Sequence, residues 1–222
     1  MTTVFPAAVL WDMDGTIVDT EPYWMLAETE LVESFGGTWT HEDALQLVGS
    51  GLWHSARVLQ SHGVKLGEDE IIEALTTRVI EQVRVLVPWR PGAKELLLEL
   101  HHKGIPSALV TMSIRRLAVL VVELIDFPAF QAIVAGDDVE HSKPHPEPYL
   151  KGAAALGFEA TECVAIEDSS TGLASAVASG AVSIGVPLMV PISEGPGHTI
   201  WPSLAGRTVA DLAAVFTSGR TA

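Results

Sequence analysis

Cysteine is nearly absent from the sequence, since Cys163 is the only one in 222 residues. The chain therefore cannot form an intramolecular disulfide, which fits a reducing compartment, and we expect a cytoplasmic location. Cys163 begins the apolar run 163–166, which is typical of a buried strand. We interpret it as a small core residue rather than as a catalytic thiol.

Basic residues are also scarce, with 13 lysines and arginines against 28 aspartates and glutamates and a formal net charge of -15. Because an acidic chain repels polyanions, we expect neither nucleic acid nor an anionic membrane surface as a partner. No apolar run is long enough to span a membrane, and the N-terminus lacks the basic and apolar regions of a signal peptide. An anionic substrate would need a site whose local charge overcomes this field.

Apolar residues are abundant, at 48%, and only 18% of the residues are charged. This composition is typical of a globular protein, and the length suffices for a core that carries an inserted module. Apolar periodicity predicts a strand at 7–11, followed only by helices between about residues 17 and 86. From residue 88 onward, apolar runs alternate with helical patterns, which is typical of a doubly wound parallel α/β sheet.

The first strand has to join strands that follow more than 80 residues later in the sequence. We therefore predict an α/β core of residues 1–16 and 88–222, with a helical cap domain, 17–87, inserted between its two parts. The stretch 187–202 is rich in proline and glycine, and we interpret it as a loop. The later strands are predicted at 105–110, 132–135, 163–166 and 182–186.

Polar and charged residues follow the predicted strands at the points where they end. Asp12 and Asp14 come two residues apart after the first strand, and two such carboxylates repel each other unless a cation or a proton lies between them. The carboxyl ends of strands in an open α/β sheet form the edge where ligands bind. Later strands bring further candidate groups to the same edge: Thr111-Met112-Ser113, Ser142-Lys143-Pro144 and Glu167-Asp168-Ser169-Ser170.

In these motifs the chain resembles the haloacid dehalogenase superfamily, in its branch of capped phosphatases and β-phosphoglucomutase-like enzymes. The motifs occur in the family's order along the predicted core, and a helical insertion directly after the first motif resembles the family's small cap. The resemblance implies a Rossmann-like core, an aspartyl-phosphate mechanism and Mg²⁺ as cofactor. The matching stretches are Asp12-Met13-Asp14-Gly15-Thr16, Thr111, Lys143-Pro144-His145-Pro146-Glu147-Pro148-Tyr149 and Glu167-Asp168-Ser169-Ser170-Thr171-Gly172.

The resemblance also implies a role for each carboxylate. Asp12 is expected to be the nucleophile, and Asp14 the acid that protonates the leaving group and then deprotonates water. Mg²⁺ is expected to bind Asp12, Asp168 and the backbone carbonyl of Asp14. Glu167 is expected to bind the metal directly or through water.

The phosphoryl oxygens are expected to lie against Thr111, the backbone of Met112 and Lys143. The lysine would also shield the nucleophile from the negative charge of the substrate. His141 and His145 flank this lysine, and we interpret them as exposed loop residues rather than as zinc ligands. The cap is expected to select the leaving group.

Two activities remain open within this branch of the superfamily, because Asp14 favours phosphoryl transfer over dehalogenation but serves phosphatases and phosphomutases alike. A mutase must hold a second phosphate, and Leu52 stands where the family's β-phosphoglucomutases have a cap arginine. Arg57 or His54 could replace that arginine. Gly49, Trp53 and His54 are expected to face the substrate, although Trp53 as part of the cap core is an equal alternative.

We therefore predict a Mg²⁺-dependent phosphatase that hydrolyses a small phosphorylated metabolite, specifically a sugar phosphate, and acts as a monomer. The first alternative is a β-phosphoglucomutase-like phosphomutase. The alternative from another class is a non-catalytic binding or regulatory protein with the same fold. This last alternative is disfavoured because the nucleophile, the acid and the metal carboxylate are all present in the sequence.

Overall fold

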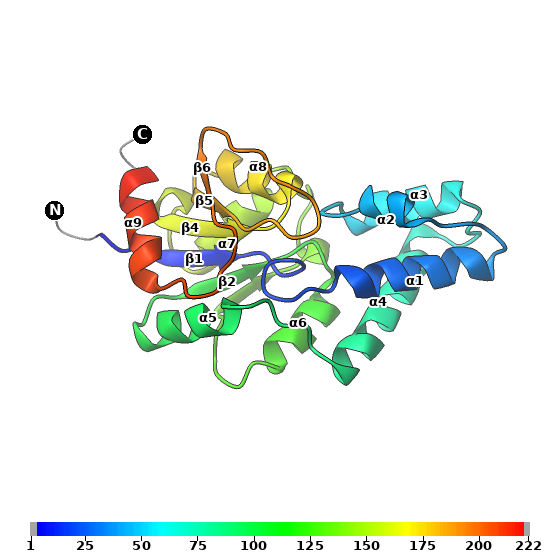
Figure 1. The fold of residues 1–222 in the computed structure, drawn as a ribbon, viewed down its shortest axis with the longest axis horizontal. Helices are drawn as coiled ribbons and strands as arrows, with labels where there is room; N and C mark the ends of the chain where they lie inside the picture. The colour runs from blue at the N-terminus through cyan, green and yellow to red at the C-terminus, as the bar shows by residue number, and fades with distance from the viewer. Residues whose placement is uncertain (1–3, 220–222) are drawn as a thin grey trace.

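The computed structural model describes residues 4–219, and a sheet of parallel strands with helices around it forms the left half of the molecule in Figure 1. The strand order is β3-β2-β1-β4-β5-β6, so the first strand of the chain lies between strands that come much later. In this register Leu10 pairs with both Ala108 and Ala165. The doubly wound parallel sheet predicted from the sequence is confirmed. Its strands are β1 Ala8–Trp11, β2 Ser107–Val110, β3 Ala132–Val134, β4 Cys163–Glu167, β5 Val182–Gly185 and β6 His198–Ile200.

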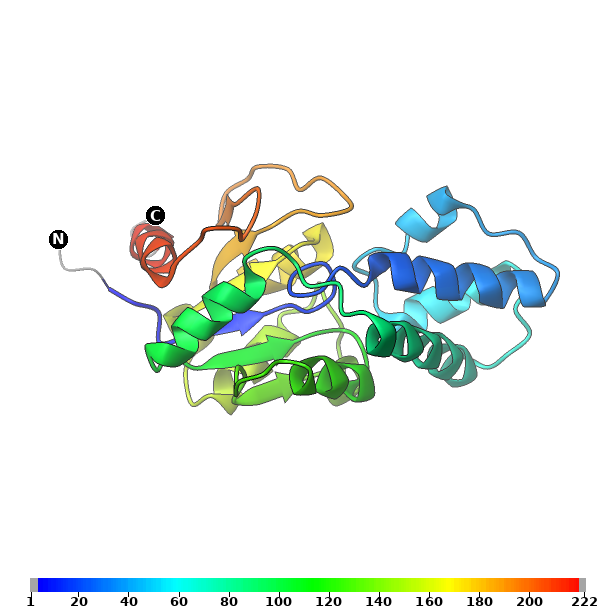
Figure 2. The same cartoon turned by 60° about the horizontal axis from the view of Figure 1, so that its bottom comes forward.

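Helices cover both faces of the sheet, because successive side chains of a buried strand point to opposite faces. On β1, Val9 and Trp11 belong to the apolar cluster that contains α5, α6 and α9, whereas Ala8 and Leu10 belong to the cluster that contains α7 and α8. Figure 2 shows these layers from a second side. The helices are α5 Ala93–His102, α6 Arg115–Glu123, α7 Glu147–Ala155, α8 Ser170–Ala178 and α9 Val209–Gly219, with short 3₁₀ helices at Gly136–Asp138 and Ala160–Glu162.

Four further helices, here called the cap helices, lie beyond the carboxyl end of β1 (Figure 1). The longest of them, α4, buries Leu75, Val79 and Val83 at helical spacing, so its apolar side packs inward. No helix in this or any other described part of the chain is long and apolar enough to cross a membrane. The cap helices are α1 Glu21–Ser34, α2 His41–Leu45, α3 Leu52–Ser61 and α4 Glu68–Val85.

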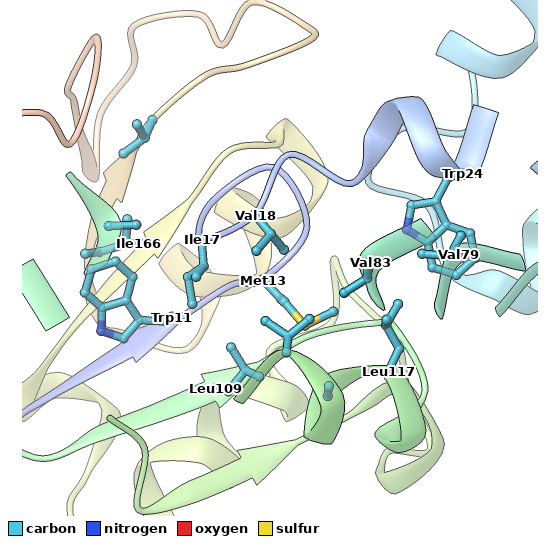
Figure 3. Packing of buried hydrophobic residues seen from close by; sticks show 14 of the residues in the cluster. Trp11, Met13, Ile17, Val18, Trp24, Val79, Val83, Leu109, Leu117 and Ile166 are labelled. Atoms are coloured by element: carbon cyan, nitrogen blue, oxygen red, sulfur yellow. The ribbon is translucent and has the colours of Figure 1, made fainter. Parts of the chain in front are cut away.

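The chain passes between the sheet and the cap helices twice, and the two passages lie side by side. The amide of Asp19 donates to the carbonyl of Pro88 and that of Arg90 to the carbonyl of Ile17, both at 2.8 Å. Figure 3 shows that apolar packing continues across this point, from Trp11 in the sheet through Met13 to Val83 on α4. The sheet and the cap helices therefore share one apolar cluster.

The C-terminal part of the chain differs from the prediction. The stretch 187–202 is not entirely a loop, because His198–Ile200 forms β6, which pairs with β5 at the edge of the sheet. This strand has three residues and a mostly polar composition, so it has no alternating apolar pattern. Helix α9 was not predicted either, although its buried residues Leu212 and Phe216 recur at helical spacing.

Candidate active site

Lys143 joins two buried carboxylates at the carboxyl end of the sheet. Its Nζ atom donates to Asp12 Oδ1 at 2.7 Å, to Glu167 Oε1 at 2.6 Å and to the carbonyl of Val110 at 2.9 Å. Asp12 directly follows β1, Glu167 is the last residue of β4, and the lysine comes from the loop before α7. Tyr149 on α7 donates a further hydrogen bond to Glu167 Oε1 at 2.6 Å. The ends of β1, β2 and β4 therefore meet at this edge with α7 and the loop that precedes it.

The negative charge at this point exceeds the positive charge of the lysine. Burial, and then the charge of Glu167, raise the pKa of Asp12 to about 7. Burial and the charges of Asp12 and Glu167 raise the pKa of Asp168 well above its ordinary value. Burial alone would lower the pKa of Lys143, but the two carboxylates that it contacts raise it, so the ammonium is charged. Three buried carboxylates thus share one cation.

The same acids have the features of a divalent cation site. Oxygen atoms of Asp12, Glu167 and Asp168 lie within 4.8 Å of one another, and all three residues are buried. The Oδ2 atom of Asp12 is buried and has no hydrogen-bond partner, which is costly unless a cation binds it. Carboxylate oxygens are the ligands that Mg²⁺ prefers. These residues therefore fit the predicted metal.

Two glycines allow the carboxylates of Asp168 and Glu167 to lie directly against the backbone. Gly15 has a φ of +82°, and a Cβ atom built on it would lie 2.0 Å from Asp168 Oδ2. A Cβ on Gly172, in α8, would lie 2.0 Å from Glu167 Oε1. Both glycines belong to motifs that carry the resemblance, and their packing accounts for the absence of a side chain there.

The variant Gly15→Ala tests this close approach. The left-handed backbone costs about 1–2 kcal/mol for alanine, and the clash displaces the Asp168 carboxylate. Because Asp168 is a predicted metal ligand, we expect kcat/KM for the predicted release of phosphate to fall by about 100-fold. Gly36→Ala is the matched control, because Gly36 has a φ of +78° but no described atom within 4 Å of its Cβ position. Equal activity in the two variants, at similar melting temperatures, would contradict the interpretation.

Asp14 points to the junction between the sheet and the cap helices. Thr20 Oγ1 donates to its Oδ1 atom at 2.5 Å and Trp24 Nε1 at 3.1 Å. Its Oδ2 atom accepts hydrogen bonds from Ser113 Oγ at 2.7 Å and Thr111 Oγ1 at 3.3 Å. Ser113 belongs to the predicted strand-end group Thr111-Met112-Ser113, whereas Thr20 and Trp24 were not predicted as site residues, since no strand-end pattern marks them. Together these donors fix the carboxylate between the two parts of the molecule.

A cavity lies over these carboxylates and is closed on its far side by cap helices. Its walls include Asp12, Asp14, Thr111, Met112, Lys143 and Asp168 from the predicted set, and Gly49 from the loop between α2 and α3. Trp53 and His54 instead line a neighbouring hollow, together with Arg57. The structure therefore brings the predicted core residues and Gly49 together but places these two cap residues next to the cavity.

Two glutamates of α1 also line the cavity, and the sequence did not mark either as a site residue. Glu21 and Glu28 are 9% and 5% exposed. Glu28 Oε2 accepts a hydrogen bond from Trp39 Nε1 at 3.3 Å. Burial, followed by the charge of Asp14, raises the pKa of Glu21 to about 8, and burial raises the pKa of Glu28 to about 8. Acidic groups thus line the cap side of the cavity as well as its floor.

The raised pKa of Glu28 predicts how stability depends on pH. The folded protein holds this proton more tightly than the unfolded chain, whose glutamate titrates near 4.5, so the free energy of unfolding falls as pH rises from about 4.5 to about 8. Between about pH 5 and about pH 7, wild type should lose about 2 kcal/mol relative to Glu28→Gln, which cannot titrate. Urea unfolding at both pH values measures this. The control Glu33→Gln, at an exposed position, should show the same pH dependence as wild type. An equal change in the free energy of unfolding between the two pH values in all three proteins would contradict the raised pKa of Glu28.

The histidines that flank Lys143 lie at the surface. His141 and His145 are exposed, and their rings are 4.6 Å apart. His141 Nδ1 lies 2.9 Å from Glu147 Oε2, and Lys151 Nζ lies 2.7 Å from Glu147 Oε1. Ligand atoms of His141, His145 and Glu147 lie within 4.8 Å of one another, and the oxygens of Glu147 already contact His141 and Lys151. The interpretation of the pair as loop histidines rather than zinc ligands stays a prediction.

Comparison with known proteins identifies the family. Residues 9–186 match the model of the haloacid dehalogenase-like hydrolases, and the chain belongs to this family. It is 30% identical over 188 residues to hexitol phosphatase B of Escherichia coli (strain K12), a match that covers 81% of this chain and 83% of the relative. It is 32% identical over 187 residues to fructose-1-phosphate phosphatase YqaB of the same organism, covering 82% and 97%.

Solved structures agree with this assignment. CbbY from Rhodobacter sphaeroides, in complex with phosphate, superposes with a TM-score of 0.82 at 27% identity, covering 93% of this chain and 99% of that one. The β-phosphoglucomutase of Clostridium difficile has the same fold, with a TM-score of 0.84 at 19% identity over 98% and 100% of the chains. The predicted family, fold and enzyme class, a phosphoric monoester hydrolase, are confirmed.

Proposed function

We propose that the protein is a Mg²⁺-dependent phosphatase that hydrolyses a small sugar phosphate through an aspartyl-phosphate on Asp12. The observation that carries the proposal is the pairing of Lys143 with Asp12 and Glu167 beside the unpartnered Oδ2 atom of Asp12. The Oδ1 atom of Asp12 is thus held in place by the lysine, and the Oδ2 atom is free to bind a metal or to attack phosphorus. The names of the hexitol and fructose-1-phosphate phosphatases support a sugar phosphate as the substrate.

In the proposed reaction, a carboxylate oxygen of Asp12 forms a bond to phosphorus as the bond from phosphorus to the leaving oxygen breaks. Asp14 gives its proton to that leaving oxygen and later takes a proton from the water that attacks the phosphorus, which frees Asp12 and phosphate. Thr111 and Lys143 bind the phosphoryl oxygens. Mg²⁺ bound by Asp12 and Asp168, with Glu167 beside them, would offset the repulsion between carboxylate and phosphate. The cap domain 17–87 would exclude bulk water.

The experiment is a panel of phosphomonoesters, including fructose 1-phosphate and a hexitol phosphate, assayed for free phosphate with Mg²⁺ and with EDTA. We expect release only with Mg²⁺, and a loss of at least about 100-fold in Asp168→Asn. Asp126→Asn is the control, because the Asp126 side chain is 81% exposed. Release that survives both EDTA and Asp168→Asn would contradict the proposed metal, and no release from any substrate would contradict the proposed function.

A further inference from the structure

Glu28 is a buried acid that lines the cavity but has no role in the proposed reaction. It lies one helical repeat of seven residues after Glu21, with Trp24 and Met25 between them, and all four line the cavity from α1. Its Oε2 atom accepts from the buried Trp39. Its Oε1 atom makes no hydrogen bond within residues 4–219, and no lysine, arginine or histidine of that range forms an ion pair with it.

A buried carboxylate with so few partners is unfavourable, because burial without compensation costs free energy. A ligand that supplied the missing contacts would offset this cost. The free oxygen of Glu28 is an acceptor, and burial raises its pKa to about 8, so near neutral pH the carboxyl can donate a hydrogen bond as well. A hydroxyl group both donates and accepts. It therefore matches this acid better than a phosphate, which offers acceptors and negative charge.

The charge of the cavity wall around Glu28 also favours an uncharged hydroxyl group over a phosphate. Among the described residues that line the cavity, Lys143 is the only lysine or arginine, and it is already bonded to Asp12 and Glu167. Arg57 faces the neighbouring hollow and is paired with Glu68 at 2.9 Å. A second phosphate at the cap end would meet two acids and no cation.

We infer that Glu28 is a specificity-determining residue that binds a hydroxyl group of an uncharged polyhydroxy leaving group, and that this end of the cavity rejects bisphosphates. The inference rests on the proposed phosphatase function and narrows its substrates to monophosphates of sugars or sugar alcohols. It also disfavours the phosphomutase alternative, whose intermediate carries two phosphates.

The test compares wild type with Glu28→Leu and Glu28→Gln on four substrates: fructose 1-phosphate, a hexitol phosphate, fructose 1,6-bisphosphate and 4-nitrophenyl phosphate. The last has no hydroxyl on its leaving group, and the bisphosphate differs from the first substrate only by a second phosphate.

In wild type, kcat/KM for the better polyhydroxy monophosphate should exceed that for the bisphosphate by about 100-fold. Glu28→Leu should raise KM for that monophosphate by about tenfold or more, as for a buried hydroxyl left without its hydrogen-bond partner, and leave kcat/KM for 4-nitrophenyl phosphate within about twofold. Glu28→Gln keeps an acceptor and a donor and should lie between wild type and Glu28→Leu.

Other results would contradict either the role of Glu28 or the proposed phosphatase function. If Glu28→Leu slows all substrates equally while the control Glu33→Leu does not, Glu28 has only a structural role and the inference is wrong. It is also wrong if wild type hydrolyses the bisphosphate as well as the monophosphates, or favours 4-nitrophenyl phosphate over both of them, although the phosphatase function would stand. If wild type releases phosphate from none of the four with Mg²⁺ present, the proposed function itself fails.

Discussion

Replacing Asp12 with asparagine is expected to abolish phosphate release while the protein stays folded. An amide oxygen is a far weaker nucleophile than a carboxylate, so kcat should fall by at least about four orders of magnitude, as for the loss of a catalytic nucleophile. Asparagine has nearly the same shape as aspartate. Because burial already raises the pKa of Asp12 to about 7, removing its charge relieves repulsion with Glu167. The melting temperature should therefore equal or exceed that of wild type.

Circular dichroism and urea unfolding check the fold of Asp12→Asn, and a phosphate-release assay measures its activity. The control is Asp137→Asn, since Asp137 is exposed and accepts a hydrogen bond from the backbone of Arg115. This control should keep wild-type activity. A folded Asp12→Asn enzyme that retains more than about a tenth of the activity would show that another group attacks phosphorus.

Replacing Lys143 with methionine is expected to damage both stability and activity. The lysine side chain is 4% exposed and is the cation between Asp12 and Glu167. Removing one partner of a buried ion pair leaves uncompensated charge and costs about 3–5 kcal/mol. Activity should fall by about 10³-fold or more, because the nucleophile loses its orienting contact and the phosphoryl group its cation. Urea unfolding and steady-state kinetics measure the two effects.

Two further variants separate these effects. In Lys143→Met combined with Glu167→Gln, one repelling charge is gone, so part of the lost stability should return while activity stays low. Lys151→Met is the control, since Lys151 pairs with Glu147 at the surface and such pairs contribute about 0–1 kcal/mol. An unchanged urea midpoint in Lys143→Met would mean that its contacts do not stabilise the buried acids.

The convergence of the predicted core residues follows from one property of parallel sheets. Once alternating strands and helices are read from the sequence, the residues that end the strands must lie at one edge, and Asp12, Thr111, Glu167 and Asp168 do so. Lys143 follows β3 only after a 3₁₀ helix and a loop. The order of strands placed it at this edge, but its role was implied only by the resemblance to a known family. The roles of these residues in catalysis stay predictions until the variants are measured.

Other features depend on packing that has no signature along the chain. Glu28 looks like any polar residue of a helix, and only the position of α1 against Trp39 and the cavity makes it a buried acid. Thr20 and Trp24 reach Asp14 because the chain turns back where it enters α1. The edge strand β6 lacks an apolar alternation, and its parallel pairing with β5 is a long-range contact.

The most direct test of the proposed mechanism is to trap the phosphoryl group on the enzyme. Wild-type protein would be mixed with Mg²⁺ and its best substrate, quenched in acid within milliseconds and digested, and the peptides mapped by mass spectrometry. We predict one phosphoryl group on the peptide that contains Asp12, formed and lost at rates that account for turnover, and none in Asp12→Asn. Rapid phosphate release with no phosphorylated Asp12 peptide at any time would contradict the mechanism.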